Sequence, residues 1–340
     1  MNKLKTFVLG SCIALLGIGL SSCFKEKTES CESYVKFRYD YNLLKADAFH
    51  TQATSVDLYL FDSEGVLVRK STEQVPEGLE DNTFLVKLPR DLKTVTQMVA
   101  WAGANSDLYT IPAMTVGTST IQDLKVAINA TAGSEVKNNY PNLLWGYVKI
   151  EGGIKYKDEI TVIPMRKNTN TFRIALRAHN YDFDMDVDNF SFRIIATDGS
   201  YDYLNKGYDD KEWSYVPFYT ATETVSGVDL AVVEISMQRL ITDKDIKLEI
   251  KYKPTGESIF VDEEALDLYH KDANAKDQGY LKLYQGMAYK SYELQEYLDR
   301  EDYYPILILL ERKTVGGNFH YLSTQISINE WVIRLQEVDK

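Results

Sequence analysis

The stretch Val56-Asp57-Leu58-Tyr59-Leu60-Phe61-Asp62-Ser63-Glu64-Gly65-Val66-Leu67-Val68 decides the fold class of this 340-residue chain. In its first half an aliphatic side chain stands at every second position, a period of two that is typical of a half-buried β-strand. The Asp-Ser-Glu-Gly sequence that follows predicts a turn, and the apolar residues after it predict a strand that runs back beside the first. The stretch is therefore predicted to be a β-hairpin.

The same alternation recurs on both sides of this hairpin. Val35, Phe37 and Tyr39 alternate with charged neighbours, and one helix is predicted at 291–300, where apolar side chains recur at helical spacing. Further strands are predicted at residues 83–88, 95–101, 144–150, 159–165, 172–177, 190–195, 231–237, 246–252, 305–310 and 324–335. Many short strands with few helices predict an all-β protein built of antiparallel β-sandwiches.

The length of the chain predicts two domains, at about 150 residues for each. We divide the sequence into a leader at 1–22, a tether at 23–33, an N-terminal sandwich at 34–165 and a C-terminal sandwich at 166–340. With 38 basic against 50 acidic residues the net charge is −12. An acidic surface repels phosphate backbones, so nucleic acid is not an expected partner.

The first 23 residues indicate export and lipidation. Basic residues precede an apolar stretch from Phe7 to Leu20, which is too short for a membrane span of roughly 20 residues and is typical of a signal peptide. Leu20-Ser21-Ser22-Cys23 resembles a bacterial lipobox, which implies cleavage before Cys23 and a diacylglycerol and an N-acyl chain on that residue. An ordinary secretory leader with a cysteine nearby is the alternative. Two or more acyl chains anchor a protein stably, so Cys23 is predicted to be the membrane attachment.

Sites for chemistry are weakly indicated. Only Cys31 remains after leader removal and lipidation, so neither a disulfide nor a thiolate metal site is expected. The run Asp182, Asp184, Asp186 and Asp188 lacks the glycine and the glutamate of a calcium loop, because Val187 and Arg193 stand at those positions. None of the four histidines stands in a zinc-binding spacing, and the sequence contains no nucleophile-elbow or phosphate-binding motif. We therefore expect no enzyme and no cofactor. A glycosidase pair of carboxylates is neither located nor excluded. The histidines are His50, His179, His270 and His320.

Two blocks carry a resemblance to a known family. Tyr34-Val35-Lys36-Phe37-Arg38-Tyr39-Asp40-Tyr41-Asn42 lies shortly before the hairpin, and Leu294-Gln295-Glu296-Tyr297-Leu298-Asp299-Arg300 lies near the C-terminus. Both are similar to the fimbrium anchoring-subunit family of Gram-negative anaerobes, the lipoproteins at the base of type V pili. The resemblance implies two transthyretin-like β-sandwiches, a lipid on Cys23, a place in the outer membrane, and fimbrial shaft and accessory pilin subunits as partners. It also implies that the protein terminates fimbrial assembly.

Alternatives to the anchor role remain from the sequence. Related tip and stalk subunits are lipoproteins of similar architecture. A surface glycan-binding lipoprotein would share the leader and the fold class, and the tyrosine-rich stretches at 201–203 and 213–215 are either sugar-stacking or sheet-surface aromatics. A lipid-anchored hydrolase is a third alternative.

The last apolar stretch, residues 323–335, is predicted to be one strand, and the sequence allows two alternative roles for it. It either closes the second sandwich or is donated to a neighbouring subunit, since a backbone edge can pair with a strand of another chain. The resemblance favours donation. The candidate residues for strand exchange are Ile326, Ile328, Trp331, Ile333 and Leu335.

Overall fold

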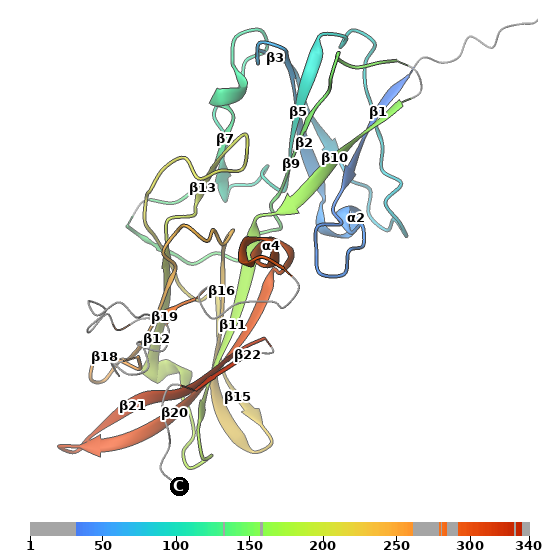
Figure 1. Ribbon diagram of the computed structural model, residues 1–340. Helices are drawn as coiled ribbons and strands as arrows, with labels where there is room; N and C mark the ends of the chain where they lie inside the picture. The colour runs from blue at the N-terminus through green and yellow to red at the C-terminus, as the bar shows by residue number, and fades with distance from the viewer. Residues whose placement is uncertain are drawn as a thin grey trace, which may run out of the picture.

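The computed structural model describes residues 32–131, 133–156, 159–260, 279, 281–283, 292–329 and 331–334. Cys23, Cys31, Leu335 and the predicted leader lie outside these residues. The described chain forms two β-rich halves arranged end to end (Figure 1). Within the described residues, no helix has the length and apolar character needed to cross a membrane.

The N-terminal half is built on one seven-stranded sheet that bends into two layers. The predicted hairpin is confirmed, because β2 and β3 pair in antiparallel register. The core of the N-terminal half contains Val35, Phe37 and Leu58, which are almost entirely shielded from solvent. A short helix, α2 (Phe49–Gln52), lies beside it. The strand order is β3 (Leu67–Gln74), β2 (Ser55–Asp62), β5 (Val95–Ala102), β9 (Leu144–Lys149), β10 (Glu159–Lys167), β1 (Ser33–Arg38) and β4 (Val86–Lys87).

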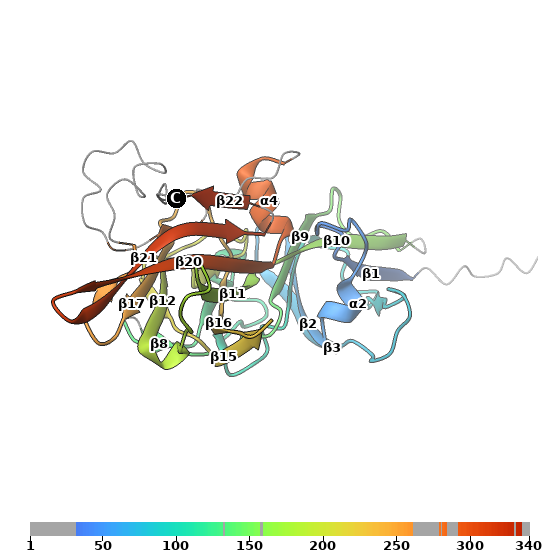
Figure 2. The ribbon, with the colours of Figure 1, turned by 90° about the horizontal axis from the view of Figure 1, so that it is seen from below.

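The C-terminal half packs two six-stranded sheets against each other, beside a helix, α4 (Leu294–Arg300), and a short 3₁₀ turn, η2 (Val187–Asn189) (Figure 2). The first sheet has the order β15 (Tyr219–Val225), β16 (Val228–Gln238), β11 (Thr169–Ala178), β20 (Tyr303–Val315), β21 (Asn318–Ile328) and β22 (Trp331–Arg334). The second has the order β18 (Glu257–Ser258), β17 (Lys247–Tyr252), β12 (Phe190–Ala196), β14 (Trp213–Tyr215) and β8 (Glu135–Val136), with β19 (Leu281–Lys282) beside β17.

The two halves share one large core. A three-stranded sheet of β13 (Ser200–Asp202), β7 (Lys125–Ile128) and β6 (Tyr109–Thr110) lies between them, next to the 3₁₀ turn η1 (Ile121–Asp123). Strands β7 and β8 precede residue 165, yet they pair with β13 and β14, which follow it. Trp101 and Phe172 likewise belong to one buried cluster. The division at 165/166 stays a prediction, and the packing of the chain crosses it.

Two features of the predicted sandwiches are corrected by the structure. The sheets are not purely antiparallel, because β1 pairs in parallel with β10, β11 with β20 and β14 with β8. These partners are separated by long crossovers, which parallel pairing requires. The predicted strand at 324–335 is also wrong as a single element. Asn329 has a φ of 52°, a left-handed conformation that asparagine tolerates, and the chain turns there from β21 into β22.

Candidate functional site

The C-terminal edge, defined here as β21 and β22, contains four of the five residues predicted for strand exchange. Ile326 and Ile328 lie in β21 and are 0% and 2% exposed, opposite Ile308 and Ile306 of β20. They are therefore core residues of this chain. Trp331 and Ile333 lie in β22, which pairs with β21 alone among the described residues and ends the sheet. Leu335 is outside the described residues.

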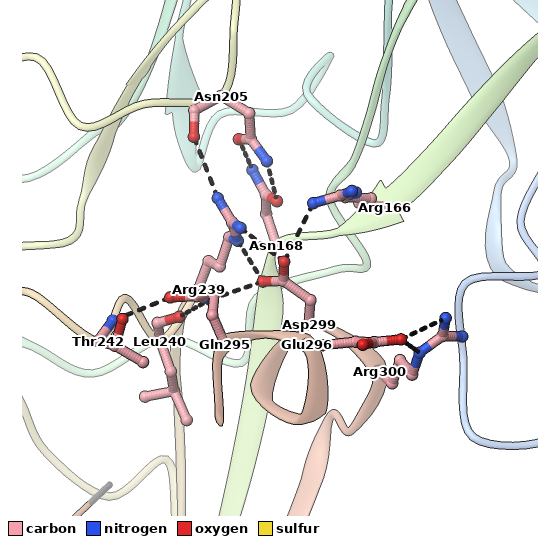
Figure 3. A network of polar contacts seen from close by, with 10 residues as sticks. All are labelled: Arg166, Asn168, Asn205, Arg239, Leu240, Thr242, Gln295, Glu296, Asp299 and Arg300. Carbon is pink, nitrogen blue, oxygen red and sulfur yellow. Dashed lines mark hydrogen bonds and ion pairs between the residues drawn. The ribbon is translucent and has the colours of Figure 1, made fainter. Parts of the chain in front are cut away.

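A second candidate site lies where the two halves meet. Helix α4 forms because Leu294, Tyr297 and Leu298 share one face, and the last two are buried in the core that the two halves share. The opposite face carries polar side chains toward the end of β10 and the end of β16 (Figure 3). We call the group that meets there the junction network. It consists of Arg166, Asn168, Asn205, Arg239, Gln295 and Asp299.

Asp299 is the centre of the junction network. Its side chain is 2% exposed and accepts two hydrogen bonds from Arg239, Nε to Oδ1 and Nη2 to Oδ2, both at 2.7 Å. Gln295 Nε2 donates to Oδ1 at 2.9 Å and Arg166 Nη1 donates to Oδ2 at 3.2 Å. Burial by itself lowers the pKa of the Arg239 guanidinium, but the hydrogen bonds and charge of Asp299 outweigh it, so that this pKa lies above its ordinary value. The carboxylate is thus fully engaged in binding cations and an amide.

The other members connect the helix to the strands on both sides. Gln295 Nε2 also donates to the carbonyl of Leu240 at 3.0 Å, and its Oε1 accepts from the Thr242 amide at 2.9 Å. Asn168, at the connection between β10 and β11, exchanges two amide hydrogen bonds with Asn205 (Figure 3). These contacts satisfy buried polar groups that would otherwise be costly, so the network positions structural elements rather than presenting a reactive group.

The two sequence blocks that carried the family resemblance meet at this site. The Arg300 guanidinium lies 3.9 Å from the ring centre of Tyr41, and the Arg166 guanidinium lies 4.4 Å from the same ring. Arg300 Nη1 also donates to the carbonyl of Asn42 at 3.4 Å. Cations over an aromatic face are attracted by its negative charge density. The two blocks therefore form one structural unit, although Asn42 and Arg300 are 258 residues apart in the sequence.

The remaining candidates are placed plainly by the structure. The aspartates of the 182–188 run are exposed, while Phe183, Met185 and Val187 between them are buried. Asp186 caps η2 by accepting a hydrogen bond from the Asp188 amide. Among the described residues, no three histidine, cysteine or acidic side chains gather as a metal site would require. Those aspartates are Asp182, Asp184, Asp186 and Asp188.

The histidines have ordinary surroundings. His179 Nδ1 lies 3.1 Å from the Thr324 hydroxyl, and His320 pairs with Glu257 at 2.6 Å. His50 is in α2, and His270 lies outside the described residues.

Three of the four aromatic side chains in the tyrosine-rich stretches are core, which corrects both interpretations for these three; the fourth, Tyr203, is half-buried and lies edge-on to Tyr147. Tyr201, Trp213 and Tyr215 are at most 3% exposed, so they can neither stack on a sugar nor cover a sheet surface. Tyr215 donates to Asp198 Oδ1 at 3.0 Å, and burial raises the pKa of that fully buried carboxyl to about 7. Sequence patterns gave no signal for a buried acid at Asp198.

Comparisons with known proteins identify relatives of the chain. The sequence model of the fimbrillin-A associated anchor proteins Mfa1 and Mfa2 matches residues 28–337. A candidate polysaccharide-binding protein from Bacteroides thetaiotaomicron has a solved structure that is 28% identical, with a TM-score of 0.72, and the match covers 90% of this chain and 99% of that one. No curated protein sequence matches the chain.

Two more distant structures share the fold. A candidate adhesin from Bacteroides ovatus is 23% identical with a TM-score of 0.68, covering 91% of this chain and 96% of that one. The fimbrial anchor protein Mfa2 from Porphyromonas gingivalis is 16% identical with a TM-score of 0.63, covering 89% and 98%. The predicted all-β fold is thereby confirmed.

The family match extends through both halves and includes both sequence blocks that meet at Tyr41. It confirms the predicted resemblance and with it the role of a fimbrial anchor, a cell-surface protein of a family that is not an enzyme family. The chain belongs to the family of fimbrillin-A associated anchor proteins Mfa1 and Mfa2.

Proposed function

We propose that this protein holds a fimbrial shaft on the outer membrane through lipid on Cys23 and that it terminates assembly of the shaft. The observation that carries the proposal is the family match, which begins five residues after Cys23 and continues to residue 337. The first strand begins at Ser33, so the folded part can lie at most about 35 Å from the lipidated residue, given about 3.5 Å for each residue of extended chain.

The fold gives this attachment a direction. Strand β1 begins at the end of the N-terminal half that is farthest from the C-terminal half, in both views (Figures 1 and 2). A lipid near Ser33 therefore directs the C-terminal half away from the membrane. We assign shaft binding to that half, at the edge strand β22, because the described part of the chain leaves its outer backbone edge open for pairing.

Two experiments test the proposal. Cells that express the Cys23→Ala chain are labelled with a clickable palmitate analogue, and the matched control is Cys31→Ala, which removes the other thiol of the mature chain. Label lost only in the first variant supports lipid on Cys23, and label retained there contradicts it. Affinity capture of the chain from outer membranes should recover a fimbrial shaft protein and accessory pilins, and recovery of oligosaccharide with no pilin would favour the glycan-binding alternative instead.

A further inference from the structure

The chain enters and leaves the N-terminal half on two neighbouring strands. It enters on β1, and it leaves on β10, which runs directly into β11 of the C-terminal half (Figure 1). The two strands are parallel, with register from Ser33 opposite Glu159 to Arg38 opposite Pro164. Entry and exit therefore lie at opposite ends of this pair, which we call the β1–β10 ladder. An antiparallel pair would place them at the same end.

This arrangement decides how the ladder responds to tension. A force that pulls Ser33 and the end of β10 apart acts along the strands, so the hydrogen bonds of the ladder share the load and the strands must slide past each other. A force that separates Ser33 from Glu159 acts across the strands and breaks the bonds one after another. Tension between a membrane attachment before β1 and a shaft beyond β10 therefore acts along the strands.

Sliding is opposed by the side chains as well as by the backbone. Val35 and Phe37 of β1 and Ile163 of β10 are fully buried in the N-terminal core. Because side chains alternate between the two faces, a slip of one residue would turn this set from the core toward solvent. At the entry end, Lys87 forms an ion pair with Glu32.

The other end of the ladder is fixed to the C-terminal half. Lys167 Nζ donates to Asp302 at 2.5 Å, and Arg166 pairs with buried Asp299 of α4. Residues at the end of β10 thus pass load to the helix and to β20 as well as to β11. Tension reaches the ladder along its axis because its exit end is held.

We propose that the β1–β10 ladder is a force-bearing clamp, loaded in shear when a fimbria is pulled away from the membrane. The inference rests on the proposed function, because that function sets the two ends between which tension acts. It adds a mechanical task to the N-terminal half and assigns that task to six paired residues on each strand.

Single-molecule pulling on the mature chain with Cys23→Ser tests the clamp. The native Cys31 thiol, two residues before β1, serves as the first attachment point, and a second thiol is introduced on exposed residues of β10. Pro164→Cys places it at the exit end and pulls in shear, and the matched control Glu159→Cys places it at the entry end and pulls across the same strands. Thermal unfolding by circular dichroism first establishes that both variants fold like the parent.

The clamp predicts an unfolding force several times higher for Pro164→Cys than for Glu159→Cys at the same pulling speed. Equal forces in the two directions, or a lower force in shear, overturn it. If either thiol destabilises the fold, Arg166→Cys and Thr161→Cys repeat the comparison. The measurement needs neither lipid nor shaft, so a failed clamp is distinct from a failed anchor, which appears as lost palmitate label or lost capture of pilins.

Discussion

Replacing Asp299 with alanine tests whether the junction network stabilises the fold. The change leaves two arginines without their shared carboxylate. Arg166 is 41% exposed at its side chain and can turn to water, whereas the side chain of Arg239 is only 12% exposed and keeps an unpaired charge. Removing one partner of a buried ion pair costs about 3–5 kcal/mol. For a unit the size of the C-terminal half, this corresponds to a fall in Tm of roughly 6–20 °C.

The matched control is Glu296→Ala on the same helix. Glu296 is 37% exposed and pairs with Arg300 one turn away. Arg300 is only 13% exposed, but it keeps the Tyr41 ring and the Asn42 carbonyl as partners when Glu296 is removed, so this change should cost less than Asp299→Ala. Both variants are unfolded by heat and followed by circular dichroism. A second test adds Arg239→Met to Asp299→Ala, which should recover part of the lost Tm because it removes the unpaired charge. Equal small shifts for Asp299→Ala and Glu296→Ala would refute the reasoning.

Three further predictions concern the C-terminal half. In the folded chain the pKa of Asp198 is about 7, against an ordinary value of 3.8, so the folded state holds this proton more tightly than the unfolded state and the resulting stability is lost as pH rises from about 4 to 7. Asp198→Asn should therefore flatten this part of the pH profile of urea midpoints. An unchanged profile would contradict the prediction. A calcium chelator should leave Tm unchanged. Calcium at a hundredfold excess over Kd would stabilise the fold by about 2.7 kcal/mol, so a drop of several degrees would reveal a calcium site in the 182–188 run. Deletion of residues 331–340 should leave the chain folded, since Ile326 and Ile328 stay in the core, but should abolish shaft capture; an unfolded chain or retained capture would refute the assignment to β22.

Local patterns predicted the strands well because alternation reports burial on one face. The stretch at 56–68 forms the expected hairpin, and the predicted helix at 291–300 appears as α4. Alternation cannot report which strands pair, and so it missed the parallel partners of β1 and β11. It also missed the turn at Asn329, since the apolar pattern continues on both sides of a residue whose role depends on its backbone conformation.

The junction network could be found only in part from the sequence. The two blocks that contain Tyr41 and Arg300 were singled out by resemblance, but their contact depends on the path of the whole chain between them. Arg239 and Asn205 carried no local signal, because a charged or amide side chain at the end of a strand is usually solvated. Arg239 is buried against Asp299 of α4, and Asn205 pairs with Asn168 at the connection between β10 and β11.

The position of fimbriae in cultures of a Cys23→Ala strain tests most directly whether this chain holds a shaft on the membrane. Shaft protein is measured in washed cells and in the medium, with wild-type and Cys31→Ala strains as references and with equal amounts of the chain in all three. The account predicts that shaft protein moves from the cells to the medium only in the Cys23→Ala strain. Fimbriae that stay on the cells when Cys23 carries no lipid would contradict it.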